Sequence, residues 1–163
     1  MKTHHVLLSL LACVSMTCMA ARAQVFGSSQ RTITVQVSAI TLVQVSAGVV
    51  NLSITAASVV AGQDAMTMTD QSTSLLWGTN SSGRKITVST SLAAPKYTLR
   101  LLALNPTAGT AAPEVTLSTA STDLLLNIGR TSGSCSLQYT AIALASTGSG
   151  SDSHTITFTV LAQ

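Results

Sequence analysis

Residues 154–161 read HTITFTVL, and in this stretch apolar and polar side chains alternate one by one. Ile156, Phe158 and Val160 fall on one face, and threonines fill much of the other. Alternation with a period of two is typical of a β-strand that buries one face and exposes the other to solvent. The stretch therefore predicts a half-buried β-strand close to the end of the chain.

The same period of two recurs towards the N-terminus. Residues 32–38 read TITVQVS, which places Ile33, Val35 and Val37 on one face. Further segments with this alternation are residues 50–55, 97–101 and 134–143, and residues 115–118 form a short strand candidate.

No segment has the 3.6-residue period of a long helix, whereas parallel sheets need crossover helices. The number and spacing of the strand segments predict an all-β fold, an immunoglobulin-like antiparallel β-sandwich of about seven to nine strands.

Two regions allow more specific predictions about strand pairing. Residues 72–79 and 84–90 flank the polar loop NSSG, which ends in Gly83, and this arrangement predicts a β-hairpin. Residues 122–129 read TDLLLNIG and allow two interpretations. Either Asp123 caps a single helical turn that stops at Gly129, or the leucines form a buried strand.

The N-terminus has the three-part layout of a secretory signal peptide. Lys2 lies in a short polar start, an apolar run follows, and residues 21–23 read ARA, the small-residue pattern that signal peptidase cleaves. The apolar run is shorter than the roughly 20 residues of a membrane-spanning helix. We predict a signal peptide at residues 1–23 and a single β-sandwich domain at residues 24–163. A membrane anchor and lipid attachment at Cys13 are the alternatives.

Cleavage after Ala23 would also change the charge of the chain. Lys2 and Arg22 would leave, so six basic residues would face five acidic ones and the net charge would fall from +3 to +1. So small a charge supplies no basic field for nucleic acid or anionic lipid. We expect a secreted, extracellular or cell-surface protein, which crosses the periplasm if the host is Gram-negative. We expect no nucleic-acid partner and no transmembrane segment after cleavage.

The segment 24–163 is poor in residues that perform chemistry. His154 is its one histidine and Cys135 its one cysteine, whereas a metal site needs several convergent ligands. Asp152, Ser153 and His154 are adjacent and cannot converge as a catalytic triad, and no Gly-x-Ser-x-Gly motif is present. We expect no catalytic, cofactor-binding or metal-binding residues, and hence a protein that is not an enzyme.

Two binding alternatives remain open. Trp77 follows two leucines and precedes Gly78, so it could form an exposed aromatic platform for a sugar, although large aromatic side chains are mostly buried. Asp64 and Asp70 could share a loop calcium, but calcium usually takes six or more oxygen ligands.

The end of the chain suggests a family. Gly150 is the fourteenth residue from the end, and the alternating Ile156, Phe158 and Val160 follow it. In this layout the chain resembles bacterial fimbrial (pilin) subunits of the chaperone–usher type and, more broadly, secreted bacterial immunoglobulin-like surface proteins. The family also has a signal peptide, a comparable length and an alternating N-terminal extension, for which residues 31–37 would serve. The usual penultimate aromatic is Ala162 here, and the common disulfide cannot form with one cysteine.

The resemblance implies an incomplete sandwich whose groove accepts an alternating strand from the next subunit. Because such a contact is head-to-tail, it propagates a filament. We therefore expect a non-enzymatic cell-surface structural or adhesive protein, with copies of itself or other surface subunits as partners. The strand-exchange contacts would be Ile33, Val35, Val37, Ile156, Phe158 and Val160. The alternatives are a terminal strand that pairs within its own sheet, and a secreted module that binds carbohydrate or another surface ligand through Trp77.

Overall fold

The computed structural model describes residues 29–163, which divide into two units. The described part of the first unit, residues 29–36, contains no helix or strand, and its side chains are exposed. The second unit, residues 37–163, contains all the strands of the described chain. The predicted signal peptide at residues 1–23 and the lipid-attachment alternative at Cys13 lie outside the described residues.

The second unit has nine strands and two short 3-10 helices within the described residues. In chain order these are β1 (Thr41–Val45), η1 (Ala56–Ser58), β2 (Ala65–Thr79), β3 (Arg84–Thr90), β4 (Thr98–Leu104), β5 (Thr110–Ala111), β6 (Val115–Thr116), β7 (Thr122–Ile128), β8 (Thr131–Leu144), η2 (Ala145–Thr147) and β9 (Ile156–Ala162). No helix among the described residues is long and apolar enough to cross a membrane.

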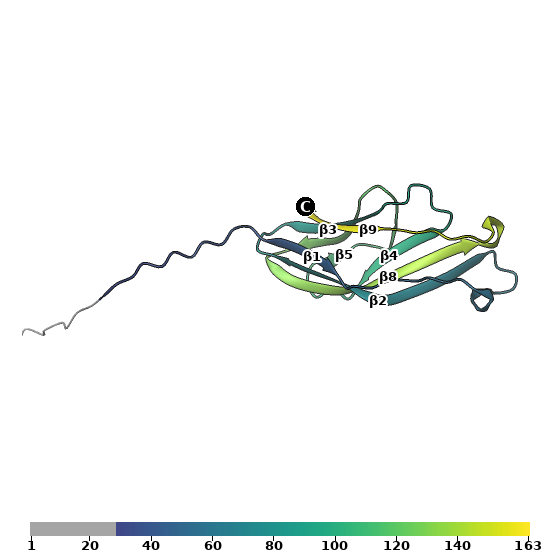
Figure 1. The fold of residues 1–163 in the computed structure, drawn as a ribbon, viewed down its shortest axis with the longest axis horizontal. Coiled ribbons are helices and arrows are strands. Elements are labelled where there is room, and N and C mark those ends of the chain that lie inside the picture. The colour runs from purple at the N-terminus through teal and green to yellow at the C-terminus, as the bar shows by residue number, and fades with distance from the viewer. Residues whose placement is uncertain (1–28) are drawn as a thin grey trace, which may run out of the picture. The chain divides into compact units, whose positions relative to one another are not determined.

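The strands form two antiparallel sheets (Figure 1). Sheet A has the order β1-β2-β8-β4-β6, and sheet B has the order β5-β7-β3-β9. Leu75, Leu101 and Leu137 of sheet A are fully buried in one cluster with Ile86 of sheet B. The prediction of an all-β, sandwich-like fold is therefore confirmed.

Alternation places the core side chains as expected. In the second half of β2, Thr73, Leu75, Trp77 and Thr79 are buried, while the residues between them are more exposed. The first half of the strand is offset from this pattern by a β-bulge between Asp70 and Thr73. A bulge inserts an extra residue and so changes which residues face inward.

The predicted hairpin between residues 72–79 and 84–90 is wrong. β2 pairs with β1 and β8 in sheet A, whereas β3 pairs with β7 and β9 in sheet B. The loop at residues 80–83 therefore crosses from one sheet to the other. Alternation identifies the buried face of each strand but not its partner strand. A short polar loop can connect two strands of different sheets as well as two strands of a hairpin.

The ambiguous segment at residues 122–129 forms strand β7, so the strand interpretation is confirmed. Leu124 and Leu125 are both fully buried, although they are consecutive. The register with β3 shifts between the pairs Ile86–Leu125 and Thr87–Asp123, which leaves Leu124 as an extra residue. This irregularity has the character of a bulge, which turns neighbouring side chains to the same side.

Candidate functional site: an apolar groove beside β9

β9 is an edge strand whose inward face is incompletely covered. It pairs with β3 on one side, and its other edge pairs with no strand of residues 29–163. Phe158 and Val160 pack against the core but stay half-buried. Their partners on β3, Val88 and Ile86, are only 1% and 0% exposed. The difference arises because β3 has a neighbouring strand on both sides.

A groove of about 1040 Å³ adjoins the first half of β9, where Ile156 and Phe158 line it. Its floor includes Leu99 of β4 together with Tyr139, Ala141 and Ala143 of β8. The length of the strands explains the open floor, because β2 and β8 have 15 and 14 residues whereas β3 and β9 have only 7 each. Sheet A therefore presents apolar inner-face residues that sheet B does not cover.

One wall of the groove is formed by the chain between β1 and η1. Val50, Leu52 and Ile54 are half-buried while the residues between them are exposed, so residues 50–55 keep the alternation that predicted a strand. They form no strand, and residues 47–54 make no backbone hydrogen bond within the described chain. The strand prediction is wrong here because alternation reports burial, whereas a strand also needs a hydrogen-bonded neighbour.

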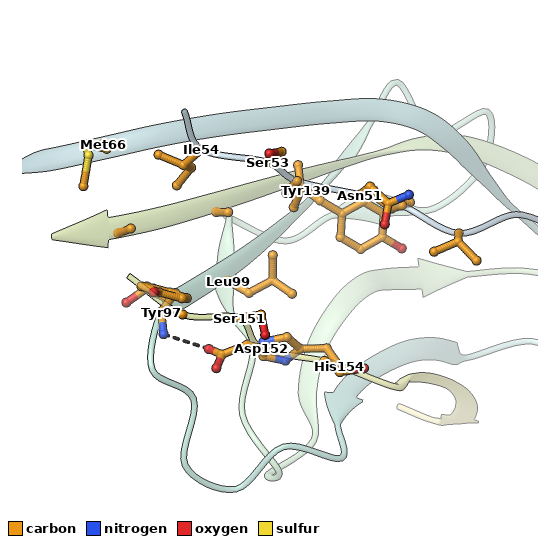
Figure 2. A pocket seen from close by; sticks show the side chains of 18 of the residues that line it. Asn51, Ser53, Ile54, Met66, Tyr97, Leu99, Tyr139, Ser151, Asp152 and His154 are labelled. Atoms are coloured by element: carbon orange, nitrogen blue, oxygen red, sulfur yellow. Dashed lines mark hydrogen bonds between the residues drawn. The ribbon is translucent and has the colours of Figure 1, made fainter. Parts of the chain in front are cut away.

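The opposite wall consists of residues 148–154, followed by Ile156 and Phe158 of β9. Figure 2 shows Tyr97, Asp152 and His154 on this side, Asn51 and Ile54 on the other, and Leu99 and Tyr139 between them. An apolar floor between two accessible backbone segments suits an extended peptide.

Hydrogen bonds hold this second wall in place. The Asp152 carboxylate accepts a hydrogen bond of 2.8 Å from the Tyr97 N–H, and the Tyr97 hydroxyl donates one of 2.9 Å to the Gly148 carbonyl. The Lys96 ammonium donates to the Ser149 carbonyl. His154 Nδ1 lies 3.0 Å from the Thr90 hydroxyl. The wall is thus anchored to the start of β4 and the end of β3.

The ionisable side chains of the described region are dispersed. No three His, Cys, Asp or Glu side chains gather where they could hold a metal within residues 29–163. Asp64 accepts hydrogen bonds from Ser146 of η2, which is 82 residues away in sequence, whereas Asp70 accepts them from Ser72, two residues further along the chain, so the two carboxylates have separate partners. The hydrogen bonds from the Ser72 hydroxyl and backbone N–H lower the pKa of Asp70.

The six predicted strand-exchange residues lie in two segments, three on β9 and three before β1. Ile156 and Phe158 line the groove, and Val160 lies further along the inward face of β9. Ile33, Val35 and Val37 are exposed by 78%, 82% and 69%.

Trp77, the candidate sugar platform, is only 4% exposed and belongs to the core cluster. A buried side chain cannot stack on a sugar. Trp77 is therefore a core residue, as large aromatic side chains usually are.

Sequence reasoning missed the floor and the anchors of the groove. Tyr139 and Leu99 occupy ordinary inward positions of their strands, and such positions indicate a core equally well. Gly150 is the one local signal, because a Cβ there would lie 2.9 Å from Lys96 Nζ and 3.1 Å from the Tyr97 hydroxyl. Because Gly150 has no side chain, the Lys96 ammonium and the Tyr97 hydroxyl can approach the backbone of this wall closely.

Comparisons of the chain with protein-family models, with curated proteins and with solved structures found no match.

Proposed function

We propose that this protein is an exported, non-enzymatic structural or adhesive subunit of the cell surface that assembles by β-strand addition. Residues 31–37 of one copy enter the groove beside β9 of the next copy. The observation that carries the proposal is the free edge of β9, whose core-facing side chains stay half-buried beside an open apolar groove. The signal-peptide layout of residues 1–23 supports export.

The strand order supports an immunoglobulin-like sandwich. The order β1-β2-β8-β4 in sheet A corresponds to strands A, B, E and D of that fold, and the neighbours β3 and β9 correspond to C and F. In an immunoglobulin sandwich, strand G lies beside F. The free edge of β9 is the equivalent position, so a strand added there would complete the second sheet.

The chemistry of the two partners is complementary. Residues 31–37 offer three apolar side chains at alternate positions, and β9 also has three, at positions 156, 158 and 160. Seven residues in a strand span about 23 Å, so the two segments match in length. The added strand would supply backbone hydrogen bonds to the edge of β9 and apolar side chains to the groove floor.

The alternative, a secreted carbohydrate-binding module, depended on Trp77 as an exposed platform. The burial of Trp77 removes the observation that favoured it. Strand addition, in contrast, uses surfaces that are accessible in the described chain.

A pair of matched substitutions in the N-terminal segment tests the proposal. Val35→Asp places a charge on the apolar face, whereas Thr34→Asp places the same charge on the opposite face of the same segment. Protein produced from the complete chain should form filaments by negative-stain microscopy and a ladder on SDS gels that collapses on boiling. Val35→Asp should abolish both and Thr34→Asp should retain both. A monomer for the unsubstituted protein, or equal effects of the two substitutions, would contradict the proposal.

A further inference from the structure

The chain that leads into β1 is held by one side chain from a distant loop. Asn80 lies directly after β2 and bonds to the backbone of two residues that precede β1. The Ile40 N–H donates to Asn80 Oδ1 at 2.7 Å, and Asn80 Nδ2 donates to the Ser38 carbonyl at 2.7 Å. The Asn80 backbone N–H also donates to the Ile40 carbonyl at 3.2 Å. We call these three bonds the Asn80 bracket.

The bracket fixes the conformation of residues 38–40. A carbonyl and the N–H two residues later point to the same side when the chain between them is extended. The amide of Asn80 bonds to such a pair, and no turn interrupts residues 38–40. The bracket therefore acts like a short piece of partner strand that extends the pairing of β1 backwards.

The bracket lies at the end of the sandwich where β9 finishes. Thr41 of β1 pairs with Thr79, Arg84 of β3 pairs with Ala162, and the loop at residues 80–83 joins the two sheets. The Gln163 N–H also donates to the Gly83 carbonyl at 2.9 Å. It follows that β1 starts near the C-terminal end of β9 and runs in the opposite direction.

The direction of β1 determines whether residues 31–37 can enter the groove of their own copy. If residues 31–37 lay beside β9 of their own copy, they would run parallel to β9. The chain would then have to reverse its direction between Val37 and Thr41. A reversal brings the first and fourth residues of a turn within about 7 Å, which is incompatible with extended residues 38–40. A strand that arrives from another copy needs no reversal.

From these observations we infer that Asn80 is a positioning residue that prevents the N-terminal segment from closing on its own groove and thereby commits it to a second copy. The inference rests on the proposed function. It also explains how a chain that has both the groove and the segment to fill it avoids becoming a closed monomer.

Cross-linking distinguishes closure within one chain from exchange between chains. Thr34→Cys and Thr157→Cys place thiols on the segment and on the exposed face of β9, where a flexible bis-maleimide can join them. Burial raises the pKa of the Cys135 thiol to about 11, so this thiol stays protonated and unreactive at neutral pH. Protein is produced from the complete chain, and mass spectrometry records its N-terminal processing.

With Asn80 present, the cross-linked product should be a ladder of joined chains. Asn80→Ala should shift the ratio of internally cross-linked monomer to ladder by about tenfold, the factor expected when two hydrogen bonds of ordinary strength are lost. Asn80→Asp should give an intermediate shift, because it keeps the acceptor for the Ile40 N–H and loses the donor. Gln71→Ala is the control, since it removes another exposed amide hydrogen bond, to Gln138.

The outcomes separate the two proposals. A ladder that Asn80→Ala leaves unchanged would overturn the role of Asn80 and leave strand addition intact. Neither ladder nor internal cross-link, in any variant, would overturn strand addition and with it the inference. Thermal unfolding of each variant checks folding, and Asn80→Asp provides the same comparison if Asn80→Ala does not fold.

Discussion

Gly133 of β8 and Trp77 of β2 are cross-strand partners, and a Cβ on Gly133 would lie 2.5 Å from Cζ2 of the Trp77 ring. The indole therefore occupies the space above the glycine and packs into the core. This contact explains why Trp77 is buried at a position where its sequence neighbour Gly78 suggested an exposed site.

Gly133→Ala should destabilise the protein by about 1–3 kcal/mol, because the added methyl group forces the indole out of a well-packed position. Gly78→Ala is the matched control on the adjoining strand, where a Cβ would meet no atom of the described residues within 4 Å. Urea unfolding followed by tryptophan fluorescence measures both. Equal losses of stability in the two variants would contradict the packing of Trp77 on Gly133.

The irregularity in β7 predicts an unusual pattern of stability losses. Leu124→Ala and Leu125→Ala should each cost about 2–5 kcal/mol, since both leucines are fully buried. Leu126→Ala should cost less, because Leu126 is only half-buried. In a regular alternating strand Leu124 and Leu125 would face opposite sides, so only one of these two variants would show a large loss, and chemical unfolding of the three variants distinguishes these patterns.

Cys135 should be inert in the folded protein. Burial raises the pKa of its thiol from 9.0 to about 11, and the thiolate is the reactive form. A maleimide at pH 7.5 should label the unfolded protein rapidly and the folded protein hardly at all. Rapid labelling of the folded protein would show that the thiol is accessible.

The same shift predicts how stability depends on pH. Because the folded pKa is the higher one, the unfolded chain loses this proton first as the pH rises above about 9. The Cys135 contribution to stability is therefore complete below pH 9 and declines between pH 9 and about 11. Cys135→Ser should remove this decline, which unfolding titrations at several pH values can measure.

Alternation predicted the all-β class and the inward faces of most strands, but it could not assign partners. The segments at residues 72–79 and 84–90 alternate clearly and are joined by a short polar loop, yet they lie in different sheets. Residues 50–55 alternate equally well and have no partner strand among residues 29–163. In both places the pattern records burial, and pairing depends on distant parts of the chain.

The groove was only partly foreseeable for the same reason. Phe158 and Ile156 were identified from the terminal alternation, and the structure places them on one wall. The floor combines Leu99 of β4 with Tyr139 of β8, which are 40 residues apart in sequence and carry no local mark of a groove. The overhang of β2 and β8 beyond sheet B, which opens the site, follows from strand lengths that the sequence pattern underestimated.

The most direct test of strand addition follows the backbone amides of β9 by hydrogen–deuterium exchange. The Val35→Asp protein serves as the receptor, because its own segment is disabled and its groove stays free. A peptide of residues 29–39 should slow exchange in β9 and in residues 47–55, whereas the same peptide with Val35→Asp should leave both unchanged. Protection confined to other parts of the sandwich, or no protection with either peptide, would contradict the account.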